Sequence, residues 1–367
     1  MWLWIPIVAL CAFYCVMVFL FWIGVNKSAK REVKCSGEKV QLSLIIPFRN
    51  EEQNLENLLE SISNQDFLKD HFEIILVNDN STDKSFAIAK DWEKRMENLS
   101  VLSLPESKRG KKEALSHGIS HSKNSIVVLT DADCTHPAGW LSAISNSFAQ
   151  SDLCLLIGLV RISPTNTFFQ KVQALEHASL TASTLGACEL GFPIMASSAN
   201  LAFDKSKVGY DFHMLNPNQP SGDDVFLLHN AKRKCAKKIQ TLNSIDGIVF
   251  TKPTSTLKEF LFQRARWASK APAYNDLATI IVAMVVFLFN LSLVGLAIGA
   301  FFKPKLLPML VFAFLLKILV DFPLLFSFQK KIGETSLMYA YFPVQIIYPL
   351  YIVITFCISL VLPVKWK

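Results

Sequence analysis

The chain has 367 residues, of which 51% are hydrophobic and 18% charged, and its formal net charge is +7. A soluble globular domain carries about 25% charged residues, so this composition argues against a purely soluble protein and also against a disordered one. The eight cysteines include no C-x-x-C pair, which gives no support to zinc or thioredoxin-like sites. Three cysteines fall in apolar runs, and we expect the others to be reduced core thiols.

Four apolar runs are long enough to cross a bilayer. The first covers residues 2–25 without a charge, and at about 1.5 Å per residue it reaches roughly 36 Å, more than the hydrocarbon core of about 30 Å. It lacks the basic start and the cleavage site of a signal peptide, so we expect an uncleaved anchor. The three further runs, near the other end of the chain, are 277–302, 306–328 and 338–364.

Basic residues beside these runs predict the orientation of the chain. Those that follow the first run or separate the last two are Lys27, Lys30, Arg31, Lys34, Lys330 and Lys331. The segment after the first run and the loop between the last two runs are both cytoplasmic if the first run crosses the membrane from outside to inside. The basic residues that then fall outside are Lys303, Lys305, Lys365 and Lys367. We therefore expect a multi-pass protein of the cell membrane with a cytoplasmic domain.

Lys317 and Asp321 are the only charged residues inside an apolar run, and they are four residues apart. On one face of a helix they can pair, which lowers the cost of burying them. One interpretation is that they contact a polar acceptor or a conducted chain. The other is a neutralised pair that packs against a neighbouring helix.

The central part of the chain alternates short apolar runs with amphipathic segments. The runs with the pattern of buried strands are 42–47, 72–77, 101–104 and 125–130. The segments with helical spacing are 51–65, 83–95, 111–121 and 137–148. This alternation predicts an α/β fold with a doubly wound, mostly parallel sheet, whose ligands bind beyond the carboxyl ends of the strands.

Polar clusters follow these strands. Asp79 follows the second strand, and Asp131 and Asp133 form a D-x-D directly after 125–130. Two carboxylates at one turn suit a hard divalent cation that shares its ligands with substrate phosphates. The basic segment 108–112, at a predicted helix start, suits a diphosphate, whereas a solvated basic loop is the ordinary alternative.

Two later segments carry further candidates. Asp223 and Asp224 stand at the start of an apolar-patterned helix, where they are either capping residues or hold a general base. Residues 263–267 lie on an amphipathic segment before an apolar run, which places them at a membrane interface. The alternative for Trp267 is a membrane-surface anchor.

Six segments of the chain occur in a fixed order: SLIIPFRNEEQNL, ILVNDNSTD, RGKKEAL, VLTDADC, GDD and QRARW. Together they resemble the inverting family 2 glycosyltransferases with a GT-A fold. The resemblance is strongest to the membrane-integrated branch, which includes cellulose, hyaluronan and poly-N-acetylglucosamine synthases. It covers about residues 40–270, and the Q-x-x-R-W element is its most specific sign.

The resemblance implies a role for each matching residue. The positions that bind the nucleotide sugar are Pro47, Glu52, Asp79, Lys111, Asp131 and Arg266. Among these, Asp79 is implied to hold the nucleotide base and Arg266 to contact the diphosphate. Asp133 is implied as the direct ligand of Mg²⁺ or Mn²⁺, and Asp224 as the general base with Asp223 beside it. Gln263 and Trp267 are implied to border the acceptor sugar.

The chain departs from the family pattern in three places. Gly222-Asp223-Asp224 replaces the usual T-E-D, and residues 197–200 replace a segment that contains glycine in many members. Only three apolar runs follow the catalytic part, fewer than chain-secreting synthases have. The protein therefore needs an additional membrane subunit or translocates nothing.

We thus expect a transmembrane helix at 1–25, a GT-A domain at 26–253, an interfacial segment at 254–276 and three transmembrane helices at 277–367. The expected function is metal-dependent, inverting transfer from a nucleotide sugar, UDP-linked, to a lipid-linked or membrane-proximal glycan acceptor, with membrane lipids as partners. A processive polysaccharide synthase of the same family is the alternative. A nucleotidyltransferase and an inactive membrane scaffold subunit are alternatives of other classes. No basic patch has the interleaved aromatics of a nucleic-acid site.

Overall fold

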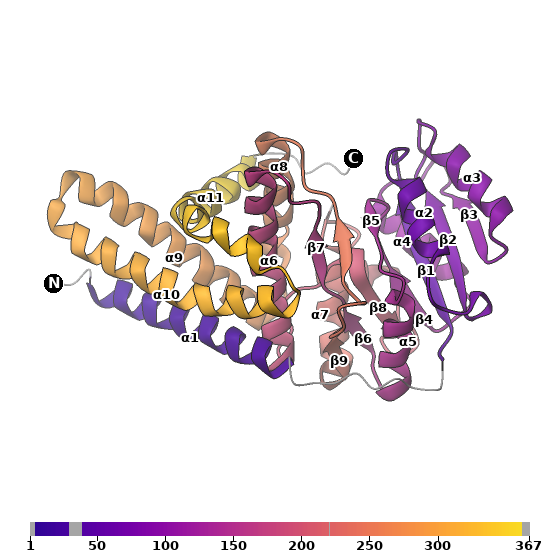
Figure 1. Cartoon of the computed structure of the whole chain (residues 1–367), viewed down its shortest axis with the longest axis horizontal. Helices are drawn as coiled ribbons and strands as arrows, with labels where there is room; N and C mark the ends of the chain where they lie inside the picture. The colour runs from indigo at the N-terminus through magenta and orange to yellow at the C-terminus, as the bar shows by residue number, and fades with distance from the viewer. Residues whose placement is uncertain (1–3, 29–38, 220, 362–367) are drawn as a thin grey trace. The chain divides into compact units, whose positions relative to one another are not determined.

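The computed structural model describes residues 4–28, 39–219 and 221–361 (Figure 1). Contacts divide the chain into two compact units, and each unit is assembled from separate stretches of sequence. Unit 1 takes in the described parts of Met1–Lys30, Pro164–Ile194 and Pro253–Val364. Unit 2 takes in the described parts of Arg31–Ser163 and Met195–Lys252.

A seven-stranded sheet forms the centre of unit 2, in the order β3-β2-β1-β4-β8-β6-β9. Its strands are β1 (Leu42–Phe48), β2 (Phe72–Asn78), β3 (Leu99–Ser103), β4 (Ile126–Leu129), β6 (Leu155–Ile157), β8 (Leu201–Asp204) and β9 (Ile239–Thr241). Strand β8 runs antiparallel to both neighbours, and the other pairs are parallel. The predicted α/β fold with a mostly parallel sheet is confirmed. A small second sheet joins β5 (Cys134–Thr135), β10 (Val249–Thr251) and β7 (Val160–Ile162).

Helices connect the strands of unit 2. They are α2 (Leu55–Ser63), α3 (Ser85–Arg95), α4 (Lys111–His121), α5 (Trp140–Gln150) and α7 (Asp223–Cys235). Helix α2 begins four residues later than the predicted segment 51–65, because the carbonyl of Glu51 already accepts the amides of Asn54 and Leu55 in a turn. All residues of β1 are buried, as its continuous apolar run predicts for a strand covered on both faces.

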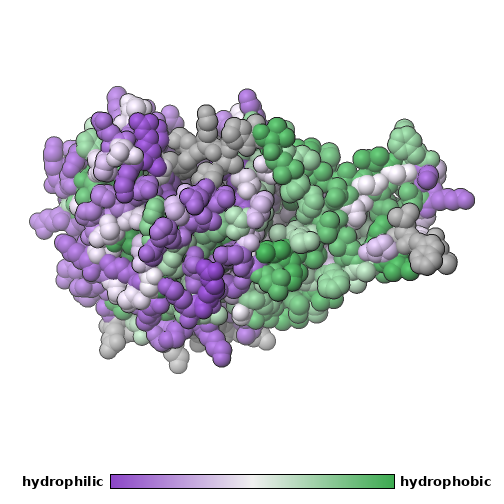
Figure 2. All heavy atoms as spheres, turned by 180° about the vertical axis from the view of Figure 1, so that it is seen from behind, coloured by the Kyte–Doolittle hydropathy of each residue, from purple (hydrophilic) through white to green (hydrophobic). Residues whose placement is uncertain are grey.

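Unit 1 contains the long apolar helices. Within the described residues, four helices have the length and composition to cross a membrane: Trp4–Ser28, Leu277–Phe302, Pro304–Lys331 and Thr335–Val361. They contain α1 (Trp4–Ser28), α9 (Leu277–Phe302), α10 (Leu307–Lys331) and α11 (Tyr341–Val361). Figure 2 shows hydrophobic side chains over the surface of these helices. One N-terminal and three C-terminal apolar helices are therefore confirmed. Several residues used for the orientation lie outside the described residues: Lys30, Arg31, Lys34, Lys365 and Lys367.

Helix α6 (Phe168–Glu189) was not predicted from the sequence. It falls inside the expected domain 26–253, but its contacts assign it to unit 1 with α1. Gly24 of α1 and Gly186 of α6 lie at the crossing of the two helices. A Cβ on Gly24 would stand 2.1 Å from the carbonyl oxygen of Gly186, and one on Gly186 would stand 2.3 Å from that of Phe21. Two glycines thus allow the backbones to touch, as small residues do between membrane helices.

Gly186→Ala is expected to destabilise unit 1. The added methyl group meets backbone atoms, which cannot rotate away, so α1 must separate from α6 at a cost of about 1–3 kcal/mol. The measurement is thermal unfolding of the full chain in detergent. Gly295→Ala on α9 is the matched control, because nothing lies within 4 Å of a Cβ there. Equal unfolding midpoints for the two variants would contradict this account of the crossing.

Lys317 and Asp321 form an ion pair on α10, with 2.7 Å between Nζ and Oδ2. The Tyr14 hydroxyl of α1 donates to Asp321 Oδ1 at 2.8 Å, and Lys317 also donates to Gln345 Oε1 of α11. Both charged residues are buried. Burying a charge is tolerated when it is paired and hydrogen-bonded, and here three helices supply the partners. The structure therefore favours the neutralised pair over a contact to a conducted chain.

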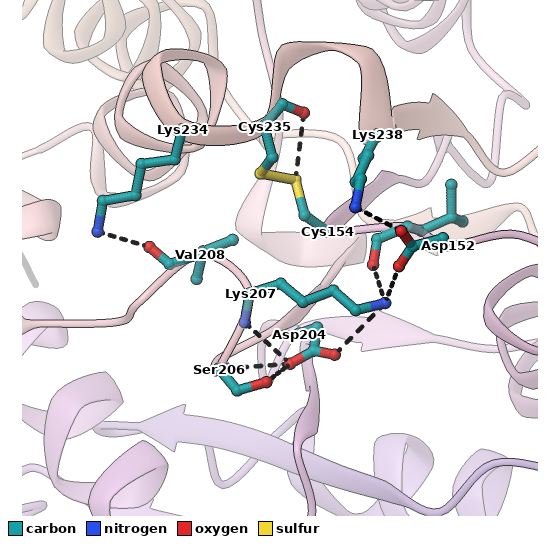
Figure 3. The surroundings of a disulfide bond; sticks show 10 residues. Asp152, Cys154, Asp204, Ser206, Lys207, Val208, Lys234, Cys235 and Lys238 are labelled. Atoms are coloured by element: carbon teal, nitrogen blue, oxygen red, sulfur yellow. Dashed lines mark hydrogen bonds and ion pairs between the residues drawn. A yellow bond between two sulfur atoms is a disulfide. The ribbon is translucent and has the colours of Figure 1, made fainter.

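Cys154 and Cys235 form a disulfide in unit 2 (Figure 3), so the expectation that both stay reduced was wrong. Cys154 precedes β6 and Cys235 ends α7, and the bond ties that helix end to the sheet. The two residues are 81 positions apart. Only the folded chain brings their Cβ atoms within bonding reach, and the spacing of cysteines in the sequence carries no sign of it. Cys35 lies outside the described residues.

Reduction of this disulfide is expected to lower the stability of unit 2 by about 4 kcal/mol, since the bond closes a long loop of the unfolded chain. The measurement is the unfolding midpoint with and without dithiothreitol. Cys154→Ser should unfold at the midpoint of the reduced protein and show no response to dithiothreitol. A wild-type midpoint that dithiothreitol leaves unchanged would contradict the prediction.

Candidate active site

The carboxyl ends of β1, β2 and β4 lie at one edge of the main sheet. These three strands are parallel neighbours, so the residues that follow them emerge together. Arg49 follows β1, Asp79 follows β2, and Asp131 and Asp133 follow β4 within a few residues. The amide of Asp79 donates to the carbonyl of Phe48 at 2.9 Å, which extends the pairing of β1 and β2 by one residue. This edge is where the sequence predicted the site.

Asp79 is completely buried at this edge. Its Oδ2 accepts the amide of Gly110 at 3.0 Å and lies 3.6 Å from Arg49 Nη1. Burial raises the pKa of Asp79, and the bond from Gly110 and the charge of Arg49 offset part of that rise. Asp79 Oδ1 and Arg49 Nε are both buried without a hydrogen-bond partner among the described residues. Such atoms are costly, so this pair fits a ligand that both donates and accepts hydrogen bonds.

Lys111 is the first residue of α4, directly after Gly110, whose φ of 104° favours glycine. Its Nζ donates to Asp131 Oδ1 at 2.6 Å and to Ser198 Oγ at 2.7 Å, and it lies 3.8 Å from Asp223 Oδ2. Burial lowers the pKa of Lys111, but the carboxylates of Asp131 and Asp223 outweigh it and hold the pKa above its usual value. Lys111 therefore stays positively charged at neutral pH.

The two acids of α7 stand in its first turn, where the N-terminal end of the helix favours negative charge. Gly222, with φ of 89°, precedes them. Asp223 is buried and faces Lys111, whereas Asp224 is half-buried and its Oδ1 accepts the amide of Val225 at 2.7 Å. Both predicted catalytic residues thus belong to the same edge of unit 2 as Lys111.

The D-x-D lies between β4 and β5, and both of its aspartates are half-buried. The amide of Cys134 donates to the Asp131 carbonyl at 3.2 Å, which closes the turn. No group of three His, Cys, Asp or Glu able to hold a metal is present in the described part of the chain. Two carboxylate ligands fit Mg²⁺ or Mn²⁺ when substrate phosphates and water complete the shell.

Pro47 and Glu52 lie at the same edge in different surroundings. Pro47 is buried in β1, beyond the last residue that pairs with β4, so its missing amide removes no bond on that side. Glu52 is exposed, and its Oε2 accepts the amide of Lys84 at 3.1 Å while its own amide donates to Asp83 Oδ2 at 3.1 Å. The contacts of Glu52 therefore hold the start of α3.

Arg49 and Ser198 were not named as site residues from the sequence. The polar cluster after the first strand was the available signal for Arg49. Ser198 lies in the segment 197–200, which was noted as a departure from the family pattern. Asn200 of that segment is a core residue, because its side chain accepts from Trp140 Nε1 at 3.0 Å and donates to the carbonyls of Leu159 and Gly247, each at 2.8 Å.

The Q-x-x-R-W residues lie in unit 1, on α8 (Leu257–Ala268). Gln263, Arg266 and Trp267 are half-buried and spaced i, i+3 and i+4, so they share one side of the helix. The guanidinium of Arg264 lies over the Trp267 ring, 4.2 Å from its centroid. His177 of α6 approaches the same ring edge-on, with 6.2 Å between centroids, and burial lowers the pKa of His177 to about 4. A neutral imidazole therefore packs against Trp267.

Comparisons with known proteins bear on this arrangement. Residues 43–206 match the family model "Glycosyl transferase family 2". The chain is 27% identical over 125 residues to glycosyltransferase AglE of Haloferax volcanii, covering 34% of this chain and 41% of that protein. It is 33% identical over 97 residues to undecaprenyl-phosphate 4-deoxy-4-formamido-L-arabinose transferase of Edwardsiella ictaluri, covering 26% of this chain and 30% of that protein. The chain thus spans less than half of the length of either relative.

A solved structure extends the likeness to the whole fold. Mannosyltransferase PcManGT from Pyrobaculum calidifontis, in complex with GDP-Man and Mn²⁺, superposes with a TM-score of 0.55. The two chains are 17% identical, and the match covers 98% of this chain and 99% of that one. At this sequence identity the likeness shows that the two proteins share a fold. Residues 43–206, less than half of the chain, are thus similar to glycosyltransferase family 2, and the relatives and the fold agree with that similarity.

Proposed function

We propose that the protein transfers a sugar from a UDP-linked donor to a lipid-linked or membrane-proximal glycan acceptor, with inversion. The observation that carries this is the continuous polar edge of unit 2, which runs from Asp79 through Gly110 and Lys111 to Asp131 and Asp223. In this proposal the buried end at Asp79 binds the nucleobase, and the charged end at Lys111 binds the diphosphate. The match of residues 43–206 to the family model supports the reaction class.

The unpaired polar atoms at the Asp79 end of this edge support a uracil nucleotide as the ligand. Asp79 Oδ1 lacks a donor and Arg49 Nε lacks an acceptor among the described residues. The imide of uracil offers an N–H flanked by carbonyl oxygens, so one base edge can satisfy both atoms. A nucleotide bound there would recover the cost of the two buried polar atoms, and this would make the two residues selective for that base edge.

In the proposed reaction, Asp224 removes a proton from the acceptor hydroxyl as its oxygen attacks the anomeric carbon. The bond from that carbon to the diphosphate breaks, and the nucleoside diphosphate leaves with the electron pair. Lys111 stabilises the negative charge that grows on the diphosphate. Asp131 and Asp133 would hold Mg²⁺ or Mn²⁺, which supplies further positive charge there. Attack opposite the leaving group turns an α-linked donor into a β-linked product.

The experiment is a donor screen with the full chain in detergent. UDP- and GDP-linked sugars are supplied with Mg²⁺, Mn²⁺ or EDTA, and undecaprenyl phosphate and octyl glucoside serve as acceptor probes. We expect metal-dependent release of one nucleoside diphosphate together with a product that carries one added sugar. A ladder of products would instead indicate processive synthesis. Release of a nucleoside monophosphate or of pyrophosphate would contradict sugar transfer.

We also propose that the catalytic part faces the cytoplasm, because Lys27, Lys330 and Lys331 lie at the ends of α1 and α10. The Cys154–Cys235 disulfide argues in the other direction, since disulfides are rare in reducing compartments. Proteolysis of sealed inside-out vesicles decides between the two. Cleavage within unit 2 supports the cytoplasmic orientation, and protection until the vesicles are opened contradicts it.

A further inference from the structure

Arg264 occupies a variable position of the Q-x-x-R-W segment and is buried, with 4% of its surface exposed. Its Nε and Nη2 donate to Glu176 Oε2 of α6 at 2.9 and 2.6 Å. Glu176 Oε1 accepts the Tyr351 hydroxyl of α11 at 2.9 Å. Three helices of unit 1 are therefore joined by one buried ion pair with additional hydrogen bonds. A buried ion pair is tolerated only when further hydrogen bonds satisfy both groups. Removing one partner leaves the other charge buried and unpaired.

The same guanidinium also contacts two neighbours on α8. Arg264 Nη1 donates to Gln263 Oε1, and the guanidinium plane lies over the ring of Trp267. It lies 4.7 Å from the ring centroid of Phe260 as well, and that ring stacks on Tyr351 with 5.5 Å between centroids. Arg264 thus touches both residues that the family resemblance assigns to the acceptor, while Glu176 of α6 holds its guanidinium in place.

We propose that Arg264 is a positioning residue, which sets the orientation of Gln263 and Trp267 through Glu176 and Tyr351. This inference rests on the proposed function, with Gln263 and Trp267 in the acceptor-binding role that the family resemblance implies. Helix α8 has twelve residues, and isolated helices of that length are marginal in water, so its orientation depends on packing. Lysine cannot take over the role, because its point charge lacks the planar fork that bonds Glu176 and Gln263 together.

The first test is kinetic and uses the donor and acceptor probe that the screen selects. Arg264→Lys is expected to raise the KM for the acceptor about tenfold or more, with the KM for the donor within about twofold of wild type. Tyr351→Phe removes one hydroxyl and should raise the acceptor KM several-fold without loss of folding. Lys258→Gln, an exposed basic residue on the same helix, is the control and should leave both values unchanged. An unchanged acceptor KM in a folded Arg264→Lys protein would overturn the proposal.

The second test needs no substrate and separates this inference from the proposed function. Amide hydrogen exchange of α8 is compared in wild type, Tyr351→Phe and Lys258→Gln. We expect exchange of residues 257–268 to be about tenfold faster in Tyr351→Phe alone, with α9 unchanged in all three. Equal protection of α8 in the three proteins would overturn the positioning role even if sugar transfer is confirmed. Faster exchange in a protein that transfers no sugar would support the positioning role of Arg264 and contradict the proposed function.

Discussion

Asp133→Ala is expected to lower sugar transfer by about a hundred- to a thousandfold, a loss of the size that follows removal of one oxyanion-hole donor from an enzyme. With two carboxylates at the D-x-D and no cluster of three possible ligands in the described chain, each carboxylate carries a large share of the proposed metal binding. The measurement is nucleoside diphosphate release as a function of Mn²⁺ concentration at saturating donor.

The Mn²⁺ titration separates metal binding from folding. In Asp133→Ala the concentration of Mn²⁺ for half-maximal release should rise along with the loss of rate, while the unfolding midpoint without metal stays near that of wild type. Asp91→Ala is the matched control, because Asp91 is an exposed carboxylate on α3 that pairs with Arg95. Transfer by Asp133→Ala within threefold of that control, at the same Mn²⁺ requirement, would show that Asp133 is not a ligand.

Much of the fold follows from patterns that local sequence carries. Each predicted strand in the first half of unit 2 is a short apolar run, and β1, β2 and β4 lie within two residues of the predicted bounds. Helix α9 has the predicted bounds, because a run of apolar residues that long has no other stable arrangement in a membrane. Asp79, Asp131 and Asp133 were expected at one edge of the sheet because residues after neighbouring parallel strands emerge together, and the structure places them there.

Helix α6 shows why other features could not be predicted. Its buried side includes Gln173, Glu176 and Thr184, which break the apolar period that marks an amphipathic helix. Their partners come from distant sequence: Thr254 bonds to Gln173, and Arg264 bonds to Glu176 from 88 residues away. A polar residue on a buried face looks like a surface residue until its partner is known.

The candidate site likewise combines features that the sequence predicts with contacts that it does not. The order of the acids along the chain was informative, but the bonds of Lys111 to Asp131 and Ser198 join residues 20 and 87 positions apart. The disulfide between Cys154 and Cys235 is a further contact of this kind. Each depends on the exact approach of two side chains, which the alternation of strands and helices does not determine.

Asp224→Asn is expected to lower the rate of transfer by about a hundred- to ten-thousandfold and to leave donor binding nearly intact. The amide keeps the shape of the side chain and its bond to the amide of Val225, but it cannot accept a proton from the acceptor hydroxyl. Donor binding is measured by calorimetry with UDP and Mn²⁺, and transfer is measured with the acceptor probe. Weak UDP binding by Asp224→Asn would place this residue on the donor side instead.

Asp223→Asn supplies the matched comparison, because the two acids are neighbours in the first turn of α7 and differ in their surroundings. Asp223 faces Lys111 at 3.8 Å, so its neutralisation should strengthen UDP binding by leaving more positive charge around the diphosphate, with a smaller effect on the rate at saturating donor. The two variants therefore separate by which step they change. If Asp223→Asn stops transfer with normal UDP binding while Asp224→Asn remains active, the general base is Asp223, and the position carried over from the family pattern is shifted by one residue.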